Sequence, residues 1–230
     1  MQKLKKNNMI ILFDLDDTLI DSESAHLLAF DQMCQEHLKI ENNNAQNWIT
    51  IKNRNLNLFF EGKISLEEHR LNSIIEFCKI NDFKISKAEA EKVYQQYHLL
   101  LLQSCKAFPD VIPALIELKN HQLGIISNGI YSDQIYKLRQ NKLLPFFSKI
   151  IVPEDIGFSK PAKEIFFYAA QEFGASLSNC IYIGDSYELD YLGSMNAGMR
   201  SILLDRKKIY QNQNRKKIYS LNQLKFAIEL

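Results

Sequence analysis

The chain lacks the features that mark several classes of protein. Among its 230 residues are only 8 glycines, 5 prolines, 4 cysteines and 1 tryptophan, and 46% are hydrophobic. This is an ordinary globular composition without a low-complexity segment. The apolar run at residues 9–13 is far shorter than the ~20 residues of a membrane-spanning helix. It is also too short for a secretory signal core. We therefore expect a soluble, cytoplasmic protein with no membrane partner.

Charge of one sign and paired cysteines are also missing. Lys plus Arg is 28 and Asp plus Glu is 27, so no basic excess points to a nucleic-acid polymer or a membrane surface. No C-x-x-C pair is present, and all four cysteines lie in apolar stretches, which predicts buried reduced thiols and argues against zinc. A chain of this length can bury a core of its own without disulfides. The sequence carries no signal for an oligomeric state.

The apolar pattern divides the chain into two kinds of region. Residues 9–13 are short, branched and apolar, which predicts a buried strand. Residues 22–105 show helical spacing and no convincing strand, and Ser65 with Glu68 forms a capping-box pattern. Helices are predicted at residues 23–38, 46–60, 66–79 and 87–103. This block is long enough to form a small helical domain inserted after the first strand.

Strands and helices alternate beyond residue 106. Strands are predicted at residues 123–126, 149–152, 180–183 and 201–204, with helices between them. This alternation predicts an α/β domain built on a parallel sheet with crossover helices. The expected domains are an α/β core of residues 1–21 and 106–230 and an all-helical insertion of residues 22–105. Residues 206–217 are basic and polar, which predicts a solvated loop.

Polar residues follow four of the predicted strands. Ligands of an open parallel sheet bind at the carboxyl ends of its strands, so these residues should meet at one edge. They are Asp14 and Asp16 after the first strand, Ser127 and Asn128 after the second, Lys160 downstream of the third, and Asp185 and Asp190 after the fourth.

Such a cluster suits metal-assisted phosphoryl transfer. Packed carboxylates repel one another, and Mg²⁺ with oxygen ligands relieves that repulsion. A carboxylate such as Asp14 can attack phosphorus and form an aspartyl phosphate. Ser127, Asn128 and Lys160 can hold the phosphoryl oxygens. Asp16 can protonate the leaving group and then deprotonate water. The residues thus predict Mg²⁺-dependent transfer of a phosphoryl group to water.

Four motifs resemble those of the haloacid dehalogenase superfamily: FDLDDTL at 13–19, SNG at 127–129, KP at 160–161 and GDSYELD at 184–190. The resemblance implies a Rossmann-like core with a helical cap of the C1 type. It implies that Asp14 is the nucleophile and Asp16 the general acid and base. Mg²⁺ would be bound by Asp14, Asp185 and the backbone carbonyl of Asp16. Thr18 and Asp190 would support the site, Asp190 through a metal-bound water or by orienting Lys160.

The resemblance leaves several substrates open. Dehalogenating members lack a carboxylate two positions after the nucleophile, so Asp16 favours a phosphatase acting on a small phosphorylated metabolite. Residues 48–70 and 126–129 resemble pyrimidine 5′-nucleotidase-like members, which implies a nucleoside 5′-monophosphate. Phosphatases of sugar phosphates, acylneuraminate 9-phosphate or phosphoglycolate and a phosphomutase are alternatives. A phospho-accepting receiver domain is a further alternative, although receivers have no helical insertion.

Overall fold

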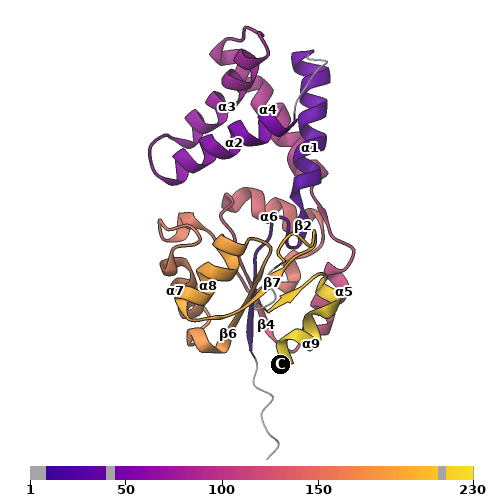
Figure 1. Ribbon diagram of the computed structural model, residues 1–230, viewed down its shortest axis with the longest axis vertical. Helices are drawn as coiled ribbons and strands as arrows, with labels where there is room; N and C mark the ends of the chain where they lie inside the picture. Colours follow the sequence, from indigo (N-terminus) through magenta and orange to yellow (C-terminus); the bar gives the residue numbers. More distant parts are fainter. Residues whose placement is uncertain (1–8, 40–44, 212–215, 230) are drawn as a thin grey trace, which may run out of the picture. The chain divides into compact units, whose positions relative to one another are not determined.

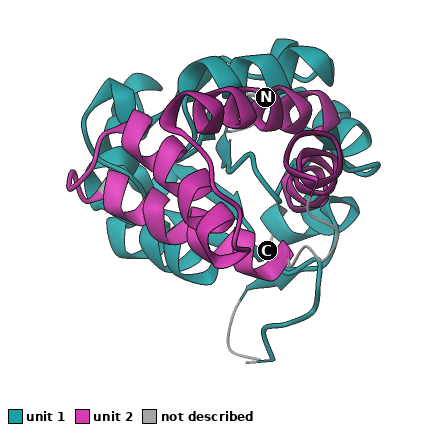
Figure 2. Cartoon of the chain, turned by 90° about the horizontal axis from the view of Figure 1, so that it is seen from above, with its two compact units in different colours: residues 1–21, 106–230 teal, residues 22–105 magenta. Residues whose placement is uncertain are grey.

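The computed structural model describes residues 9–39, 45–211 and 216–229, apart from the side chains of Phe60 and Glu229. The chain divides into two compact units (Figure 2). Unit 1 comprises residues 1–21 and 106–230, and unit 2 comprises residues 22–105. Among the described residues, no helix is long and apolar enough to cross a membrane.

Unit 1 is built on a six-stranded sheet in the order β5-β4-β1-β6-β7-β8, and every neighbouring pair in it is parallel. The predicted α/β fold with a parallel sheet is therefore confirmed. The strands are β1 (Ile10–Phe13), β4 (Gln122–Ile126), β5 (Lys149–Ile151), β6 (Cys180–Gly184), β7 (Arg200–Leu204) and β8 (Lys217–Ile218).

Helices pack against both sides of this sheet, with α7 and α8 on one side and α5 and α9 on the other (Figure 1). The helices of unit 1 are α5 (Val111–Glu117), α6 (Tyr131–Gln140), α7 (Lys163–Glu172), α8 (Gly193–Ala197) and α9 (Leu224–Glu229). A π-helical segment, Tyr187–Leu192, precedes α8, and short 3₁₀ turns lie at Leu144–Phe146, Pro153–Asp155, Leu177–Asn179 and Leu221–Gln223. Because both faces are covered, the strands are continuous apolar runs rather than alternating ones.

The register of the central strands decides where the polar residues lie. Phe13, the last residue of β1, pairs with Ile125 of β4 and with Ile183 of β6. The residues just beyond these strands therefore emerge at the same edge of the sheet. Strand β1 is almost fully buried, with each of its residues at most 5% exposed, so this edge is fixed to a rigid core.

Two very short pairings were not predicted. Strands β2 (Ile20–Asp21) and β3 (Lys106–Ala107) form an antiparallel pair where the chain leaves unit 1 and returns to it. Strand β8 adds two residues to the edge of the main sheet. These strands could not be predicted, because a strand shows its alternating pattern only over about four or more residues, and each of them has two.

In the described part of unit 2, all the secondary-structure elements are helices, joined by turns and short loops. It contains α1 (Ser22–Gln32), a π-helical continuation at Met33–Leu38, α2 (Ala45–Phe60), α3 (Leu66–Ile80) and α4 (Lys87–Ser104). The predicted capping box is present, because Ser65 Oγ accepts from the Glu68 amide at 3.1 Å and the Glu68 carboxylate accepts from the Ser65 amide at 2.7 Å. The core of unit 2 contains an aromatic cluster whose members are at most 1% exposed: Phe30, Trp48, Phe77 and Tyr97.

Candidate active site

Asp14 occupies the first position beyond β1 and is 6% exposed. Its amide donates to the carbonyl of Ile183 at 2.9 Å, which continues the β1–β6 pairing by one residue. Burial raises the pKa of Asp14 well above its usual range; the ammonium of Lys160 opposes this rise and the carboxylates of Asp190 and Asp185 add to it. The raised pKa of Asp14 thus follows mainly from its burial at the end of the strand, which disfavours the charged carboxylate.

Lys160 joins the acidic groups to one another. Its Nζ lies 2.6 Å from Asp14 Oδ1, 2.7 Å from Asp190 Oδ1 and 3.0 Å from the hydroxyl of Tyr182. Burial by itself would lower the pKa of this ammonium, but Asp14 and Asp190 outweigh burial and hold the pKa above its usual value. Lys160 is therefore a buried cation at neutral pH, and its charge is fixed by two carboxylates.

Asn128 contacts the loop that carries Lys160. Its carboxamide binds the backbone of Lys160 on both sides: Nδ2 donates to the Lys160 carbonyl at 3.0 Å, and Oδ1 accepts from the Lys160 amide at 2.8 Å. These contacts make Asn128 a support for the loop that carries Lys160. The phosphate contact that the sequence predicts for Asn128 stays a prediction. The sequence alone did not show that the two loops lie side by side.

Asp14, Asp185 and Asp190 offer carboxylate oxygens that all lie within 4.8 Å of one another. Burial, then Asp190 and Asp17, raise the pKa of Asp185 to about 7, while the hydroxyl of Thr18 donates to Asp185 Oδ1 at 3.1 Å. Three carboxylates against one lysine leave excess negative charge on hard oxygen donors, which fits a divalent cation such as Mg²⁺.

Asp190 is the member of this cluster whose oxygens are most engaged by the protein. Its Oδ1 accepts from Lys160 and from the Tyr182 hydroxyl, at 2.7 and 3.1 Å, and its Oδ2 accepts from the Ser186 amide at 2.9 Å. These bonds support the expectation that Asp190 orients Lys160; this role and the alternative one, through a metal-bound water, stay predictions. Asp14 and Asp185 are the carboxylates better able to contact a cation directly.

Asp16 meets two residues that the sequence analysis missed. Lys137 Nζ lies 2.6 Å from Asp16 Oδ1, and Gln134 Nε2 donates to Asp16 Oδ2 at 2.9 Å. Gln134 Nε2 also donates to Ser127 Oγ at 2.9 Å, so Asp16 and Ser127 are linked through one side chain. One feature of the sequence could have indicated these two residues: Gln134 and Lys137 are polar and three positions apart on the helix that follows Ser127-Asn128-Gly129.

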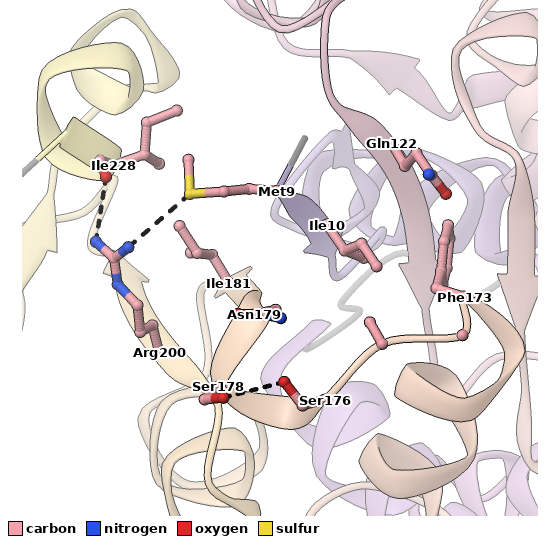
Figure 3. Close-up of a pocket in the computed structure, with 12 residues that line it drawn as sticks. Met9, Ile10, Gln122, Phe173, Ser176, Ser178, Asn179, Ile181, Arg200 and Ile228 are labelled. Carbon is pink, nitrogen blue, oxygen red and sulfur yellow. Dashed lines mark hydrogen bonds between the residues drawn. The ribbon is translucent and has the colours of Figure 1, made fainter. Parts of the chain in front are cut away.

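A cavity of about 920 Å³ lies elsewhere in unit 1 (Figure 3). Its lining includes Ile10, Gln122 and Arg200, which begin β1, β4 and β7. The cavity is therefore at the amino ends of the parallel strands, at the edge opposite Asp14. The guanidinium of Arg200 bonds to the carbonyl of Ile228 at 3.1 Å and approaches the sulfur of Met9 at 4.0 Å. We do not assign this cavity to the catalytic site.

Similar proteins share this architecture over most of their length. The protein YfnB of Bacillus subtilis, described as a HAD-hydrolase, is 30% identical over 84% of this chain and 83% of its own. Its solved structure, which is bound to magnesium, matches with a TM-score of 0.84 over 98% of this chain and all of the other, at 26% identity.

Two further relatives carry names of phosphatases. A glyceraldehyde 3-phosphate phosphatase of Methanocaldococcus jannaschii is 26% identical over 96% of this chain and 95% of its own. The pyrimidine 5′-nucleotidase PynA of Streptococcus pneumoniae is 26% identical over 84% of this chain and 81% of its own.

The family model for haloacid dehalogenase-like hydrolases matches residues 11–204, which include every catalytic-site residue described above and all strands of the main sheet except Ile10 of β1 and the short β8. The inserted unit 2 falls inside the same match. With the site geometry and the YfnB likeness, this match identifies the chain as a member of the haloacid dehalogenase-like hydrolase family.

Proposed function

We propose that this hydrolase is a Mg²⁺-dependent phosphatase that cleaves a small phosphomonoester through an aspartyl phosphate on Asp14. The arrangement of Asp14 carries the proposal: it is buried at a strand end, 2.6 Å from Lys160 and within one carboxylate cluster with Asp185. Two of the relatives are named for phosphatase activities, which supports the same reaction class.

The chemistry takes two steps. A carboxylate oxygen of Asp14 attacks phosphorus, and the bond from phosphorus to the ester oxygen breaks as Asp16 gives that oxygen a proton. Asp16, now a carboxylate, then takes a proton from a water molecule that attacks the phosphorus of the aspartyl phosphate. The Asp14–phosphorus bond breaks and inorganic phosphate leaves. The Ser127 hydroxyl and the Lys160 ammonium hold phosphoryl oxygens in both steps.

We propose Asp14, Asp185 and the backbone carbonyl of Asp16 as the ligands of Mg²⁺. The bound cation would offset the charge of the carboxylates and the phosphoryl group. Support comes from the 4.8 Å carboxylate cluster and from the raised pKa values of Asp14 and Asp185, both of which a cation would bring down. The magnesium-bound structure of YfnB is consistent with this choice of metal.

Unit 2 is our candidate for the substrate-reading cap. It is inserted in sequence between the strand that precedes Asp14 and the strand that leads to Ser127, where the family resemblance implies a helical cap. A cap of this kind would read the part of the substrate beyond the phosphate. A nucleoside 5′-monophosphate is the first class to test, and a sugar or triose phosphate is the second. The pyrimidine 5′-nucleotidase PynA is named for the first class, and the glyceraldehyde 3-phosphate phosphatase is named for the second.

The test is phosphate release from purified protein with Mg²⁺, measured for nucleoside monophosphates, sugar phosphates, phosphoglycolate and p-nitrophenyl phosphate. Asp14→Asn should abolish release while the fold is retained. Glu164→Gln, which alters an exposed carboxylate on α7, is the matched control and should keep wild-type activity. Undiminished activity of Asp14→Asn would exclude the mechanism. Isomer formation without phosphate would indicate a phosphomutase, and a stable phosphoprotein without turnover would indicate a receiver.

A further inference from the structure

Helix α6 turns two polar side chains inward beside the site. Gln134 and Lys137 are three residues apart, so they lie on the same face of the helix. Gln134 is fully buried and Lys137 is 8% exposed, whereas Arg139 on the same helix is exposed. Glutamine and lysine are rarely buried to this degree unless they are paired. Their contacts across the site therefore account for their position.

Gln134 connects two parts of the site through its amide nitrogen. The two hydrogens on Nε2 serve two acceptors, Asp16 Oδ2 and Ser127 Oγ, each at 2.9 Å. Its Oε1 is buried and has no hydrogen-bond partner among the described residues, so the donor end of the amide is the end that the protein uses. The glycine of the second motif makes room for it, because a Cβ on Gly129 would lie 1.7 Å from Gln134 Nε2.

Lys137 completes the hold on Asp16. Its Nζ contacts Asp16 Oδ1 at 2.6 Å, while Gln134 contacts Oδ2, so each carboxylate oxygen receives a hydrogen bond from a different side chain of α6. Two such bonds fix the rotation of the carboxylate group about its bond to Cβ. The Lys137 side chain is 10% exposed and that of Asp16 is 31% exposed, so the lysine is buried while part of the Asp16 carboxylate remains accessible from outside the protein.

We propose that Gln134 and Lys137 are positioning residues that aim the Asp16 carboxylate at the leaving-group oxygen. Through Gln134, they also keep Asp16 at a fixed distance from the Ser127 hydroxyl. This inference rests on the proposed phosphatase function, and it adds to it two residues of α6 that touch no substrate. Their effect should therefore be confined to the proton transfer that Asp16 performs.

The experiment compares two leaving groups. p-Nitrophenolate departs without a proton, whereas an alkoxide needs one, so in the first step only alkyl esters depend strongly on Asp16. The substrates are p-nitrophenyl phosphate and the alkyl phosphomonoester that the wild type cleaves fastest. Gln134→Met and Lys137→Met remove the contacts at similar side-chain volume. Lys137→Arg tests rescue, and Arg139→Met is the matched control on the exposed face of α6. Circular dichroism and Trp48 fluorescence verify the fold of each variant.

We expect either Met variant to lower kcat/KM for the alkyl ester by roughly 10–100-fold and kcat/KM for the aryl ester by less than about 3-fold. The ratio kcat/KM is compared because it covers only the steps up to the aspartyl phosphate, whereas kcat also includes the hydrolysis step, in which Asp16 acts for both esters. Lys137→Arg should recover much of the loss, and Arg139→Met should match the wild type. In an Asp16→Asn background, Lys137→Met should cost little more, because both changes remove one function. Equal losses on the two esters, or none, would overturn the inference alone. A wild type that cleaves neither ester would overturn the proposed function, and the inference with it.

Discussion

The two units bury their polar groups in opposite ways. In unit 1 the buried charges converge: Asp14, Lys160 and Asp190 are each at most 6% exposed, and Lys160 bonds to both carboxylates although the three residues come from distant parts of the chain. In unit 2 the buried polar groups bond singly to uncharged partners: the Trp48 indole donates to the Tyr97 hydroxyl of another helix at 3.2 Å, and two other side chains bond within their own helix. Asn55 donates to the carbonyl of Ile51 and Ser73 to that of His69, each four residues earlier.

This difference separates polar residues that stabilise from those that perform chemistry. A side chain that bonds to its own helix removes an unsatisfied group and does little else. Buried like charges around Asp14 cost stability, and the apolar strands beneath them must offset that cost. The comparison therefore predicts that core truncation harms unit 2 mainly through stability, while small changes beside the charge cluster harm function first.

The largest expected effect is in the aromatic core of unit 2. Phe30 is fully buried, stacks on Trp48 at 5.8 Å between ring centroids and meets Phe77 edge to face at 5.1 Å. Phe30→Ala should lower the free energy of unfolding by about 3–5 kcal/mol, since it removes buried area and leaves a cavity. Urea unfolding followed by the fluorescence of Trp48, the sole tryptophan, measures it. Leu28→Ala, at a 52% exposed site on α1, should change the midpoint little.

A Phe30→Ala midpoint equal to the wild type would show that unit 2 does not depend on this cluster. Hydrogen exchange of the β1 and β6 amides extends the test to unit 1. If those amides lose protection together with the Trp48 signal, the two units unfold as one. If the β1 and β6 amides keep their protection, unit 1 remains folded when unit 2 unfolds, and the two units also differ in stability.

The same contrast explains what the sequence could and could not predict. Asp14 and Asp185 directly follow apolar strands, and parallel strands align their carboxyl ends, so the local pattern is enough to place these residues at one edge. Gln134 and Lys137 lie on a helix, where polar residues face either solvent or a site. Only the packing of α6 decides between these two faces, and the sequence does not show that packing.

Arg206 was also misjudged, for a similar reason. The basic segment 206–217 predicted a solvated loop, and residues 212–215 of it lie outside the described part of the chain. The Arg206 side chain is instead only 16% exposed. It binds both carboxylate oxygens of Asp110 at 2.9 and 3.0 Å and lies 4.0 Å from the Phe108 ring centroid. Its partner is 96 positions earlier in the chain, beyond the reach of a local pattern.

A smaller change in stability, with a larger effect on function, is expected at Gly184. A Cβ added to this last residue of β6 would lie 2.3 Å from Asp190 Cγ. Gly184→Ala must therefore displace the carboxylate that orients Lys160. We expect a loss of about 1–3 kcal/mol in unfolding free energy, as for overpacked cores. Phosphate release should fall by more than this loss of folded protein explains. A variant with reduced stability but wild-type kcat would contradict the role assigned to Asp190.

The smallest expected effect is a pH dependence in unit 2. His69 is 4% exposed, and burial, with Lys52 and Arg70 nearby, lowers its pKa to about 4. In the unfolded chain the pKa of histidine returns to about 6.5. Between these values the unfolded state binds more protons, so stability falls as the pH falls from 6.5 toward 4.

We expect a loss of about 1 kcal/mol between pH 7 and pH 5, after allowing for partial relaxation around the charged ring. Urea midpoints from Trp48 fluorescence at the two pH values measure this loss. His69→Gln should flatten the slope, because glutamine binds no proton. An unchanged slope in His69→Gln would place the acid sensitivity elsewhere. The carboxylate cluster of unit 1 would then be the alternative source of the acid sensitivity. In that case the Trp48 signal would report the unfolding of unit 1, and the two units would not differ in their response to pH.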